Sequence, residues 1–438
     1  HTFQQIEEMV SRLAINFNQT LYEEGIEVNK IYQAFKMEGP EEKAVTQKVE
    51  SLLAKSALQV DTYSTIKDIN KQEWNKLFEG RGSFDWDGVD LLEQSFTNNL
   101  EEANNWDFDY LIIRDEYKTP ILATFFTTAI AKDDMLSSAS ISSVVEEMRA
   151  KEGENFLTSK SVMMGSMLTE GEHLFLNRTH PSWKAAMECM FDVASHLQET
   201  YDANAIMYRD FLDEDAEMDR FLMENGFIKT DLPTSHTIEN FDWQNQEEWI
   251  NTLSAKSRRH VRGTILKKEH QFETKIAIKA TDRQIEHWYD LYLGVKKNSL
   301  ALNTYTLPFK LFKNMATSPN WEVLELHLKK NQISDNKAVA VIFNYKSGDS
   351  YSAMFIGVDY SLQADFMPYR QALFQTILRA KELGSKNLHL GYTADLEKRR
   401  LGATSKQTFG YVQIKDHYNL SVISNIAKNS HKRVLVSK

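Results

Sequence analysis

The sequence is poor in the residues that mark several protein classes. One cysteine, Cys189, stands in 438 residues, which excludes an internal disulfide and fits a reducing compartment, so we expect a cytoplasmic protein. Only 7 prolines and 17 glycines argue against a repetitive or low-complexity chain. No apolar run reaches the ~18 residues that a membrane span needs, and no signal-peptide pattern is visible, so we expect no membrane partner.

Basic residues are also fewer than acidic ones. The 51 lysines and arginines face 62 aspartates and glutamates, for a net charge of −11, and this balance argues against general affinity for nucleic acid. A local basic patch stays open. Hydrophobic residues make up 42% of the chain and aromatics 11%, which is enough to build the cores of two or three domains.

Several catalytic motifs are missing. The sequence has no G-x-S-x-G, no Walker loop, no H-E-x-x-H, and no G-x-G-x-x-G after a strand. The carboxylate pairs Asp133–Asp134 and Glu146–Glu147 lack a partner histidine or a calcium loop, so we interpret them as solvated surface and expect no metal. Cys189, within MECMF, lies on an apolar helical face and is interpreted as core.

The most informative stretch runs from Ser350 to Gly391. Tyr351 to Val358 is apolar and aromatic enough for a buried strand. Pro368 then suits the first turn of a helix, whose apolar residues recur at helical spacing until Gly384. Asn387 to Leu390 is a short second strand. Strand, helix and strand in this order favour a parallel pair with a right-handed crossover.

An earlier stretch repeats this pattern. His173 to Leu176 is predicted to be a strand, Pro181 to start a helix, and Ala205 to Tyr208 to be the closing strand. After each closing strand come a short helix, a glycine and another strand, DRFLMENGFIKTDL in one place and EKRRLGATSKQTFGYVQI in the other. The copies share pattern rather than letters, and they predict two half-chains with one fold.

A basic helix is predicted near the start of the second half, from Gln246 to His270. Apolar residues mark its inner face, and its outer face carries Lys256, Arg258, Arg259, Arg262, Lys267 and Lys268. Such a face serves an anionic partner or is simply solvated, and a charge run is usually solvated.

The first 56 residues are predicted to be helical, with an amphipathic stripe in HTFQQIEEMVSRLAINF. This stretch resembles the closing helix of pyridoxal-phosphate α-oxoamine synthases. The resemblance, together with a start at His1, implies that the chain is the C-terminal part of a fusion with such a PLP-dependent enzyme. An ordinary N-terminal helix is the alternative.

The order of elements, with LSAKSRRHVRGTI and the unit ending AKELGSKNLHLGY, resembles the GNAT N-acyltransferase fold, in particular its FemAB-like and BioF2-like tandem branch. The resemblance covers about residues 57–420 and implies an α/β (α+β) fold with a mixed sheet. The expected organisation is a helical segment at 1–56, a first GNAT-like domain at 57–234, and a second at 235–438.

The resemblance also implies a cofactor and its site. Members of the superfamily hold the pyrophosphate of an acyl-CoA, such as acetyl-CoA, at the N-terminus of the crossover helix, where amides are free and the dipole is positive. In this sequence the matching residues are Tyr369, Arg370 and Gln371. The preceding segment, SLQADFMPYR, contains no glycine, unlike the family's glycine-rich phosphate loop.

Acyl transfer to an amine needs a base, a stabilised oxyanion and a proton donor. In the GNAT fold the reacting carbonyl lies where two parallel strands separate, which here means near the ends of Tyr351–Val358 and Asn387–Gly391. His389 titrates near neutral pH and is a candidate for proton transfer. Tyr392 is a candidate acid for the leaving group, and Asp359 closes the first strand as a third catalytic candidate.

Three functions remain open at this point. The first is an N-acyltransferase that uses an acyl-CoA and a small-molecule or peptide amine acceptor, with its site in the second half. The second is a FemAB-like transferase that uses aminoacyl-tRNA, whose phosphates the basic helix would contact. The third is a non-catalytic GNAT-like pair that binds a partner or completes a fused PLP enzyme.

Overall fold

The structure is a computed structural model, and it describes residues 54–212, 214–298, 302–329 and 337–426. The predicted helical segment at 1–56 therefore lies almost wholly outside the described residues, as does the stretch that resembles a synthase tail. A search of the described residues finds no helix that is long and apolar enough to cross a membrane.

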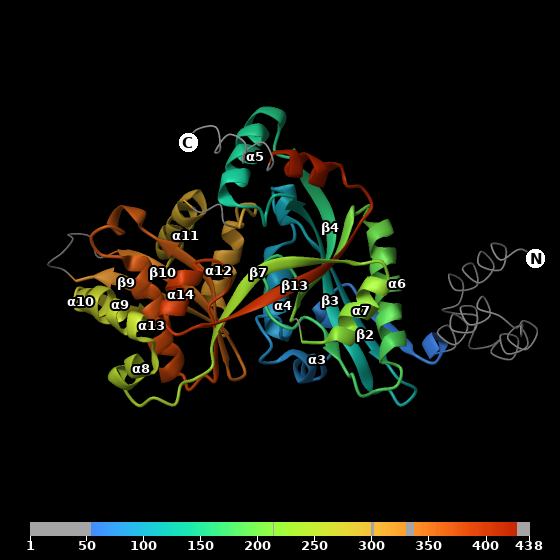
Figure 1. Cartoon of the computed structure of the whole chain (residues 1–438), viewed down its shortest axis with the longest axis horizontal. Coiled ribbons are helices and arrows are strands. Elements are labelled where there is room, and N and C mark those ends of the chain that lie inside the picture. The colour runs from blue at the N-terminus through green and yellow to red at the C-terminus, as the bar shows by residue number, and fades with distance from the viewer. Residues whose placement is uncertain (1–53, 213, 299–301, 330–336, 427–438) are drawn as a thin grey trace, which may run out of the picture. The chain divides into compact units, whose positions relative to one another are not determined.

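The fold is α/β with a mixed sheet, as the sequence predicts (Figure 1). The strands are β1 (Gln59–Tyr63), β2 (Asp107–Arg114), β3 (Pro120–Lys132), β4 (Thr158–Met164), β5 (Phe175–Leu176), β6 (Ala205–Phe211), β7 (Ile228–Ile238), β8 (Phe272–Ile276), β9 (Trp321–Leu328), β10 (Ala338–Ser347), β11 (Ser350–Val358), β12 (Asn387–His389) and β13 (Thr404–Ile414).

The α-helices begin in the described part of the chain with α3. They are α3 (Lys71–Phe78), α4 (Trp86–Ser95), α5 (Ala139–Glu152), α6 (Trp183–Thr200), α7 (Ala216–Glu224), α8 (Gln246–Thr252), α9 (Ala255–His260), α10 (Lys267–Glu269), α11 (Asp282–Asn298), α12 (Phe309–Thr317), α13 (Pro368–Glu382) and α14 (Asp395–Arg400). A π-helical turn, Val261–Leu266, connects α9 to α10.

The chain divides into two compact units. The described residues of the smaller unit are 54–63, 109–125 and 174–196, and the larger unit holds the rest. In the smaller unit, β1 pairs antiparallel with β2, and β5 pairs antiparallel with the first part of β3. In the larger unit the strand order is the second part of β3, then β4, β6, β13, β7, β12, β11, β10, β9 and β8.

Two strand pairs in the larger unit are parallel, and each is joined by a crossover helix in sequence. β11 and β12 flank α13, as the sequence predicts. β4 and β6 flank α6, but the sequence analysis placed the opening strand at His173–Leu176, and this was wrong. Phe175–Leu176 instead pairs antiparallel with β3, whereas the parallel partner of β6 is Thr158–Met164. Only the last three residues of β4 are buried, so its apolar signal is short.

The strands β7 and β13 run side by side in the larger unit (Figure 1). β13 pairs with β6 on its other edge, and β7 pairs with β12. β7 also contains the boundary predicted between residues 234 and 235. The two predicted halves therefore share the strand β7. The sheet continues from β6 through β13 and β7 to β12.

The long basic helix predicted at Gln246–His270 is interrupted. α8 ends before Leu253, which is extended, and the Ser254 hydroxyl accepts a bond from the Ser257 amide to cap α9. Serine is a favourable N-cap because its oxygen satisfies an amide that has no partner inside the helix. The apolar spacing continues across this break, so spacing alone did not reveal it.

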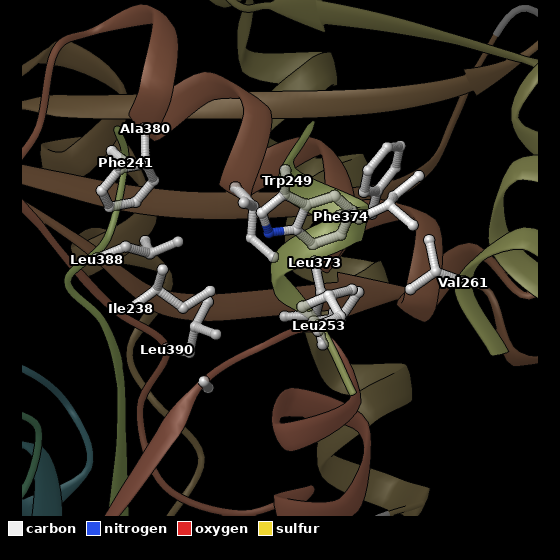
Figure 2. Packing of buried hydrophobic residues seen from close by; sticks show 14 of the residues in the cluster. Ile238, Phe241, Trp249, Leu253, Val261, Leu373, Phe374, Ala380, Leu388 and Leu390 are labelled. Atoms are coloured by element: carbon white, nitrogen blue, oxygen red, sulfur yellow. The ribbon is translucent and has the colours of Figure 1, made fainter. Parts of the chain in front are cut away.

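The crossover helix α13 is held by a large apolar cluster (Figure 2). Leu373, Phe374 and Ile377 of α13 pack with Trp249 and Ile250 of α8, and all five are almost fully buried. Leu388 joins this cluster from β12. Each such side chain contributes about 1.5–3 kcal/mol when fully buried. Packing against α8 and β12 therefore fixes the position of α13.

One expectation about surface carboxylates was wrong. Asp134 is fully buried and forms an ion pair with Arg149 of α5, at 2.5 Å between Oδ1 and Nη2. Arg149 also bonds Glu146, at 2.6 Å. The buried Arg149 guanidinium directs its donors at these two carboxylates. The charge-assisted hydrogen bonds offset the cost of removing the charges from water.

Candidate functional site

The parallel strands β11 and β12 separate after a short contact. They pair at three positions, the last between Ser352 and His389. Beyond that point lies a cavity of about 250 Å³ in the larger unit. It is lined by Met167, Leu168, Glu170, Tyr292, Val295, Lys296, Leu302, Thr304, Leu307, Ile342, Ala353, Met354, Phe355, Ile356, Tyr369, Leu373, Leu390, Gly391, Tyr392, Thr393 and Lys398.

Most of this lining is apolar or aromatic. Residues 353–356 of β11 form one wall, and both faces of the strand contribute because β12 no longer pairs with it there. α11 and α13 provide Tyr292 and Tyr369. An apolar cavity with a few polar groups is the usual form of a small-molecule site, and Glu170, Lys296 and Lys398 are its charged groups.

Glu170 is the acidic group of the cavity. The Ser235 hydroxyl donates a hydrogen bond to its Oε1. Burial raises the pKa of Glu170 to about 7, although the bond from Ser235 acts in the opposite direction. A carboxyl with this pKa exchanges a proton near neutral pH, which is what a general base requires.

A tightly bonded loop, residues 165–173, holds Glu170. The hydroxyls of Ser166 and Thr169 lie 3.1 Å apart, and each bonds a backbone amide of the same loop. Gly171 has φ +130°, and a Cβ there would lie 2.1 Å from the Arg81 carbonyl oxygen. Glycine is therefore required beside Glu170, because only glycine permits both this φ and this approach.

Lys398 of α14 is a basic group of the cavity lining. Its Nζ donates to the carbonyl oxygens of Gly391, at 2.8 Å, and Tyr392. Burial lowers the pKa of Lys398 to about 8, and the nearby Glu170 opposes this effect. The ammonium thus fixes the turn after β12 and places a positive charge near Glu170.

Tyr392 connects the cavity to a buried ionic chain. Its hydroxyl donates to Asp210 Oδ1 at 2.7 Å and accepts from Arg209 Nη2 at 3.0 Å. Burial would raise the pKa of Asp210, but Arg209 and His173 outweigh it and lower that pKa. His173 Nδ1 lies 3.3 Å from the other carboxylate oxygen of Asp210. Asp210 is therefore an anion that orients the Tyr392 ring.

The backbone around the cavity contains several unusual conformations. Asp210, Met367, Thr393 and Ala394 all have positive φ, between 51° and 65°. Such values cost non-glycine residues about 1–2 kcal/mol each. Strain of this kind gathers at functional sites where the surrounding structure enforces it, and here it occurs in the segments that end at the cavity.

Of the six site residues predicted from sequence, Tyr369 and Tyr392 line the cavity. Burial raises the pKa of each. His389 does not line it, and burial lowers its pKa. Its neighbours Leu388 and Leu390 belong to the apolar cluster, so alternation along β12 directs His389 to the other face. Asp359 caps a short 3₁₀ turn by accepting from the Ser361 amide at 3.0 Å.

The two remaining predicted residues lie at the start of α13. Arg370 forms a two-pronged ion pair with Glu397, at 2.7 and 3.0 Å. The Gln371 side chain donates to the Ile265 carbonyl at 2.5 Å. The sequence analysis expected the amides of Tyr369, Arg370 and Gln371 to be unpaired, but those of Arg370 and Gln371 donate to the Met367 carbonyl.

Sequence reasoning missed Glu170, Lys398 and the Arg209–Asp210 pair. The last had a local signal, because two charged residues close the apolar strand AIMY. Glu170 had none, since it stands in a loop between strands that the spacing did not resolve. Among the described residues, no group of three or more histidines, cysteines and carboxylates is arranged to hold a metal ion.

The basic residues predicted at 256–268 are only partly free. Arg258 donates to the Leu253 carbonyl, Arg262 pairs with Glu247, and Lys268 bonds the Asp365 carbonyl. Lys256 and Arg259 are exposed. Half of the run thus bonds neighbouring groups, although Arg262 is also exposed.

A protein-family model matches about a third of the chain. Residues 255–399 match the model of the acetyltransferase (GNAT) domain, a segment that contains β11, α13 and β12. The chain is thus a transferase with a GNAT-type domain, as the sequence resemblance predicted. No curated protein matches the chain.

Three solved structures align with most of this chain at low sequence identity. A crystal structure of FemX aligns with a TM-score of 0.50 at 10% identity and covers 82% of this chain and 99% of its own. A conserved protein of unknown function from Bacteroides thetaiotaomicron gives 0.45 at 12% identity, with 81% and 99% covered. A tandem GNAT protein from the clavulanic acid biosynthesis pathway gives 0.44 at 8%, with 82% and 99% covered.

Proposed function

We propose that the chain transfers an acyl group from an acyl-CoA to an amine in the cavity beyond β11 and β12, with Glu170 as general base. The observation that carries the proposal is a carboxyl with a pKa of about 7 in the lining of that cavity. The proposal includes two tandem GNAT-like halves, 57–234 and 235–438, with the acceptor cavity formed by residues of both.

The proton steps follow from the positions of Glu170 and Tyr392. An ammonium acceptor gives one proton to Glu170, which releases it to solvent, and the neutral nitrogen then bonds the acyl carbon. As the carbon–sulfur bond breaks, the second nitrogen proton reaches the sulfur by way of the Tyr392 hydroxyl. Arg209 and Asp210 bond that hydroxyl and keep it at the cavity wall. His389 and Asp359 stay sequence predictions and have no step here.

The CoA pyrophosphate is assigned to the start of α13, at Tyr369, Arg370 and Gln371. Pro368 begins this helix, and its N-terminal dipole favours an anion. Because Glu397 holds Arg370, a pyrophosphate there must replace the carboxylate as the partner of the guanidinium. The α13 site therefore binds the donor only with a rearrangement of Glu397.

The catalytic role is tested by Glu170→Gln, which keeps the shape of the side chain and removes the base. We expect thiol release from acetyl-CoA in the presence of a panel of amines to fall by about 10²–10⁴. Glu172→Gln is the matched control, because Glu172 is close in sequence but 71% exposed. Equal rates for the wild type and Glu170→Gln would reject Glu170 as the base.

The donor site is tested by melting curves with and without millimolar CoA. At a hundredfold excess over its dissociation constant, CoA should stabilise the wild type by about 2.7 kcal/mol. Arg370→Glu should lose most of that shift, since it places an anion beside the phosphates. An equal shift in both proteins would assign CoA to another site, such as the helix after Pro181, and no shift at all would reject the CoA donor.

A second candidate is an aminoacyl-tRNA-dependent transfer. It is supported by the fold similarity to FemX, by the absence of glycine before α13, and by the pairing of Arg370 with Glu397. Exposed Lys256 and Arg259 would contact phosphate. Reversal of both to glutamate should then abolish retention of tRNA at low salt, and the wild type should lose tRNA steeply as salt rises. If the wild type retains no tRNA at low salt, this candidate is rejected.

The third candidate is a non-catalytic module of a fused PLP-dependent enzyme. The resemblance that supports it lies in residues 1–17, outside the described residues. It would be favoured over both transfer reactions if neither CoA nor tRNA bound to the wild type.

A further inference from the structure

A network of charged side chains lies next to the cavity, on the side of α11. Its two carboxylates are already bonded to cations. Asp134 accepts from Arg149 at 2.5 Å, and Glu146 accepts from Arg149 at 2.6 Å and from Lys132 at 2.7 Å. Asn303 donates to both carboxylates, at 2.8 and 2.7 Å. Asp134 thus accepts at both of its oxygens, whereas the three donors to Glu146 all bond its Oε1.

Lys296 is the third cation of the group, and it lines the cavity. Its Nζ donates to the Thr304 carbonyl oxygen. Among the described residues, no carboxylate forms an ion pair with it. Lys132 and Arg149 each bond a carboxylate of this network directly, whereas Lys296, which lines the cavity, has no such bond among the described residues.

This arrangement is costly without a further anion. Burial lowers the pKa of Lys296 to about 8, and the nearby Lys132 adds to the effect, whereas Glu146 and Asp134 oppose it. A partly desolvated ammonium loses hydration that one carbonyl oxygen replaces only in part. An anionic group in the cavity would offset that loss with a charge-assisted hydrogen bond.

The wall beside Lys296 is apolar. Tyr292 lies one helical turn before it on α11, and Leu302, Leu307 and Phe355 complete this side. The Tyr292 hydroxyl is already bonded, since the Leu307 amide donates to it at 3.0 Å. The group that contacts Lys296 therefore arrives on an apolar body.

We propose that the cavity binds an amine acceptor whose apolar body ends in a carboxylate, and that Lys296 holds this carboxylate. The acceptor class follows from the two kinds of charge in the lining, with an amine directed to Glu170 and an acid directed to Lys296. The amine half of this assignment rests on the proposed function, whereas the recognition of a carboxylate does not.

The carboxylate half is tested by titration calorimetry with hexanoate and hexanamide as probes at pH 7. Hexanoate should bind the wild type, and Lys296→Met should weaken it at least tenfold while hexanamide binding stays unchanged. Lys296→Arg keeps the charge and should retain most of the affinity. Lys297→Met is the matched control, because Lys297 is the exposed neighbour on the same helix.

No binding of hexanoate to the wild type, or equal losses in the Lys296→Met and Lys297→Met variants, would overturn the proposal. The amine half is tested separately with 6-aminohexanoate, whose affinity should fall in Glu170→Gln although hexanoate affinity does not. Loss of the Glu170 effect alone therefore rejects the base and leaves the carboxylate site standing.

A carboxylate on the acyl group is the other source of the same chemistry. With 6-aminohexanoate as acceptor and acetyl-CoA as donor, Lys296→Met should raise the KM for the acceptor and change kcat little. The reason is that the contact with Lys296 stabilises the bound substrate and the transition state equally. If Lys296→Met instead slows only transfer from glutaryl-CoA, the carboxylate belongs to the donor and the acceptor assignment is overturned.

Discussion

The larger unit contains two parallel strand pairs that separate in the same way and are used differently. β4 and β6 pair at three positions and then diverge, as β11 and β12 do. Past the first divergence lies Arg209, whose Nη1 donates to the Ser166 carbonyl and lies 3.6 Å from Met163 Sδ. Past the second lies the cavity. The opening between β4 and β6 is filled by the Arg209 side chain of β6, whereas the opening between β11 and β12 contains the cavity.

The filled opening also supports the open one. Arg209 and Asp210 lie just past the β4–β6 divergence and bond the Tyr392 hydroxyl at the other. The loop after β4 carries Glu170 into the cavity lining. Residues of the first predicted half thus line the cavity beside the strands of the second, which a repeat of two independent sites would not predict.

The largest effect should come from emptying the filled opening. Arg209→Met removes a buried cation and leaves Asp210 charged without its partner, which costs about 3–5 kcal/mol. Urea unfolding measures the loss. The double variant Arg209→Met/Asp210→Asn removes both charges and should recover part of the stability. If the single variant is as stable as the wild type, the ion pair does not hold the opening closed.

A comparable but smaller loss should follow from Gly165→Ala in the same opening. Gly165 has φ +78°, and a Cβ there would lie 2.4 Å from the His173 ring. Backbone strain of about 1–2 kcal/mol adds to overpacking of about 1–3 kcal/mol. Urea unfolding again gives the result. A loss no larger than that of Gly384→Ala, which has φ +70° and no heavy atom within 4 Å of its Cβ, would show that the opening is not tightly filled.

The rate of the proposed transfer in the cavity beyond β11 and β12 should depend on pH near neutrality. If Glu170 acts as the proposed base, kcat/KM should rise tenfold per pH unit up to about 7 and then level, and Glu170→Gln should abolish this limb. The stability of the folded protein should change with pH in the opposite direction. Folding raises the pKa of Glu170 from 4.5, so its contribution is present below that value and is lost as pH rises through about 7. The Tm of the wild type should thus fall relative to Glu170→Gln between pH 5 and 8. A flat rate profile would contradict the role.

Local signals account for what the sequence predicted well. β11, α13 and β12 were predicted because Pro368 starts the helix, Gly384 ends it, and the apolar spacing between them is regular. Tyr392 was predicted from the place where the strands separate and Tyr369 from the start of the crossover helix, and both line the cavity, while their roles stay predictions. These inferences need only neighbouring residues and a known topology.

Long-range contacts account for what the sequence did not predict. Asp134 is buried because Arg149 folds back onto it, and the pKa of Glu170 is raised because the fold buries it, although its partner Ser235 acts in the opposite direction. Neither partner is recognisable from spacing. The predicted strand His173–Leu176 failed for a similar reason, since the true partner of β6 has only three buried residues.

The smallest effect should come from Gly391→Ala at the open side. Gly391 has φ +73°, and a Cβ there would lie 3.7 Å from both Glu170 Oε2 and the Ala353 carbonyl, at ordinary contact distance. Strain alone should therefore cost about 1–2 kcal/mol, equal to the loss in Gly384→Ala. The added methyl would nevertheless stand between Glu170 and Ala353 of β11, where the proposed acceptor amine would approach the base. Unfolding free energies of the two variants should thus agree, while the KM for amines rises only in Gly391→Ala. A much larger stability loss at Gly391 than at Gly384 would mean that the second opening is as tightly packed as the first, and that the difference between the two strand pairs does not hold.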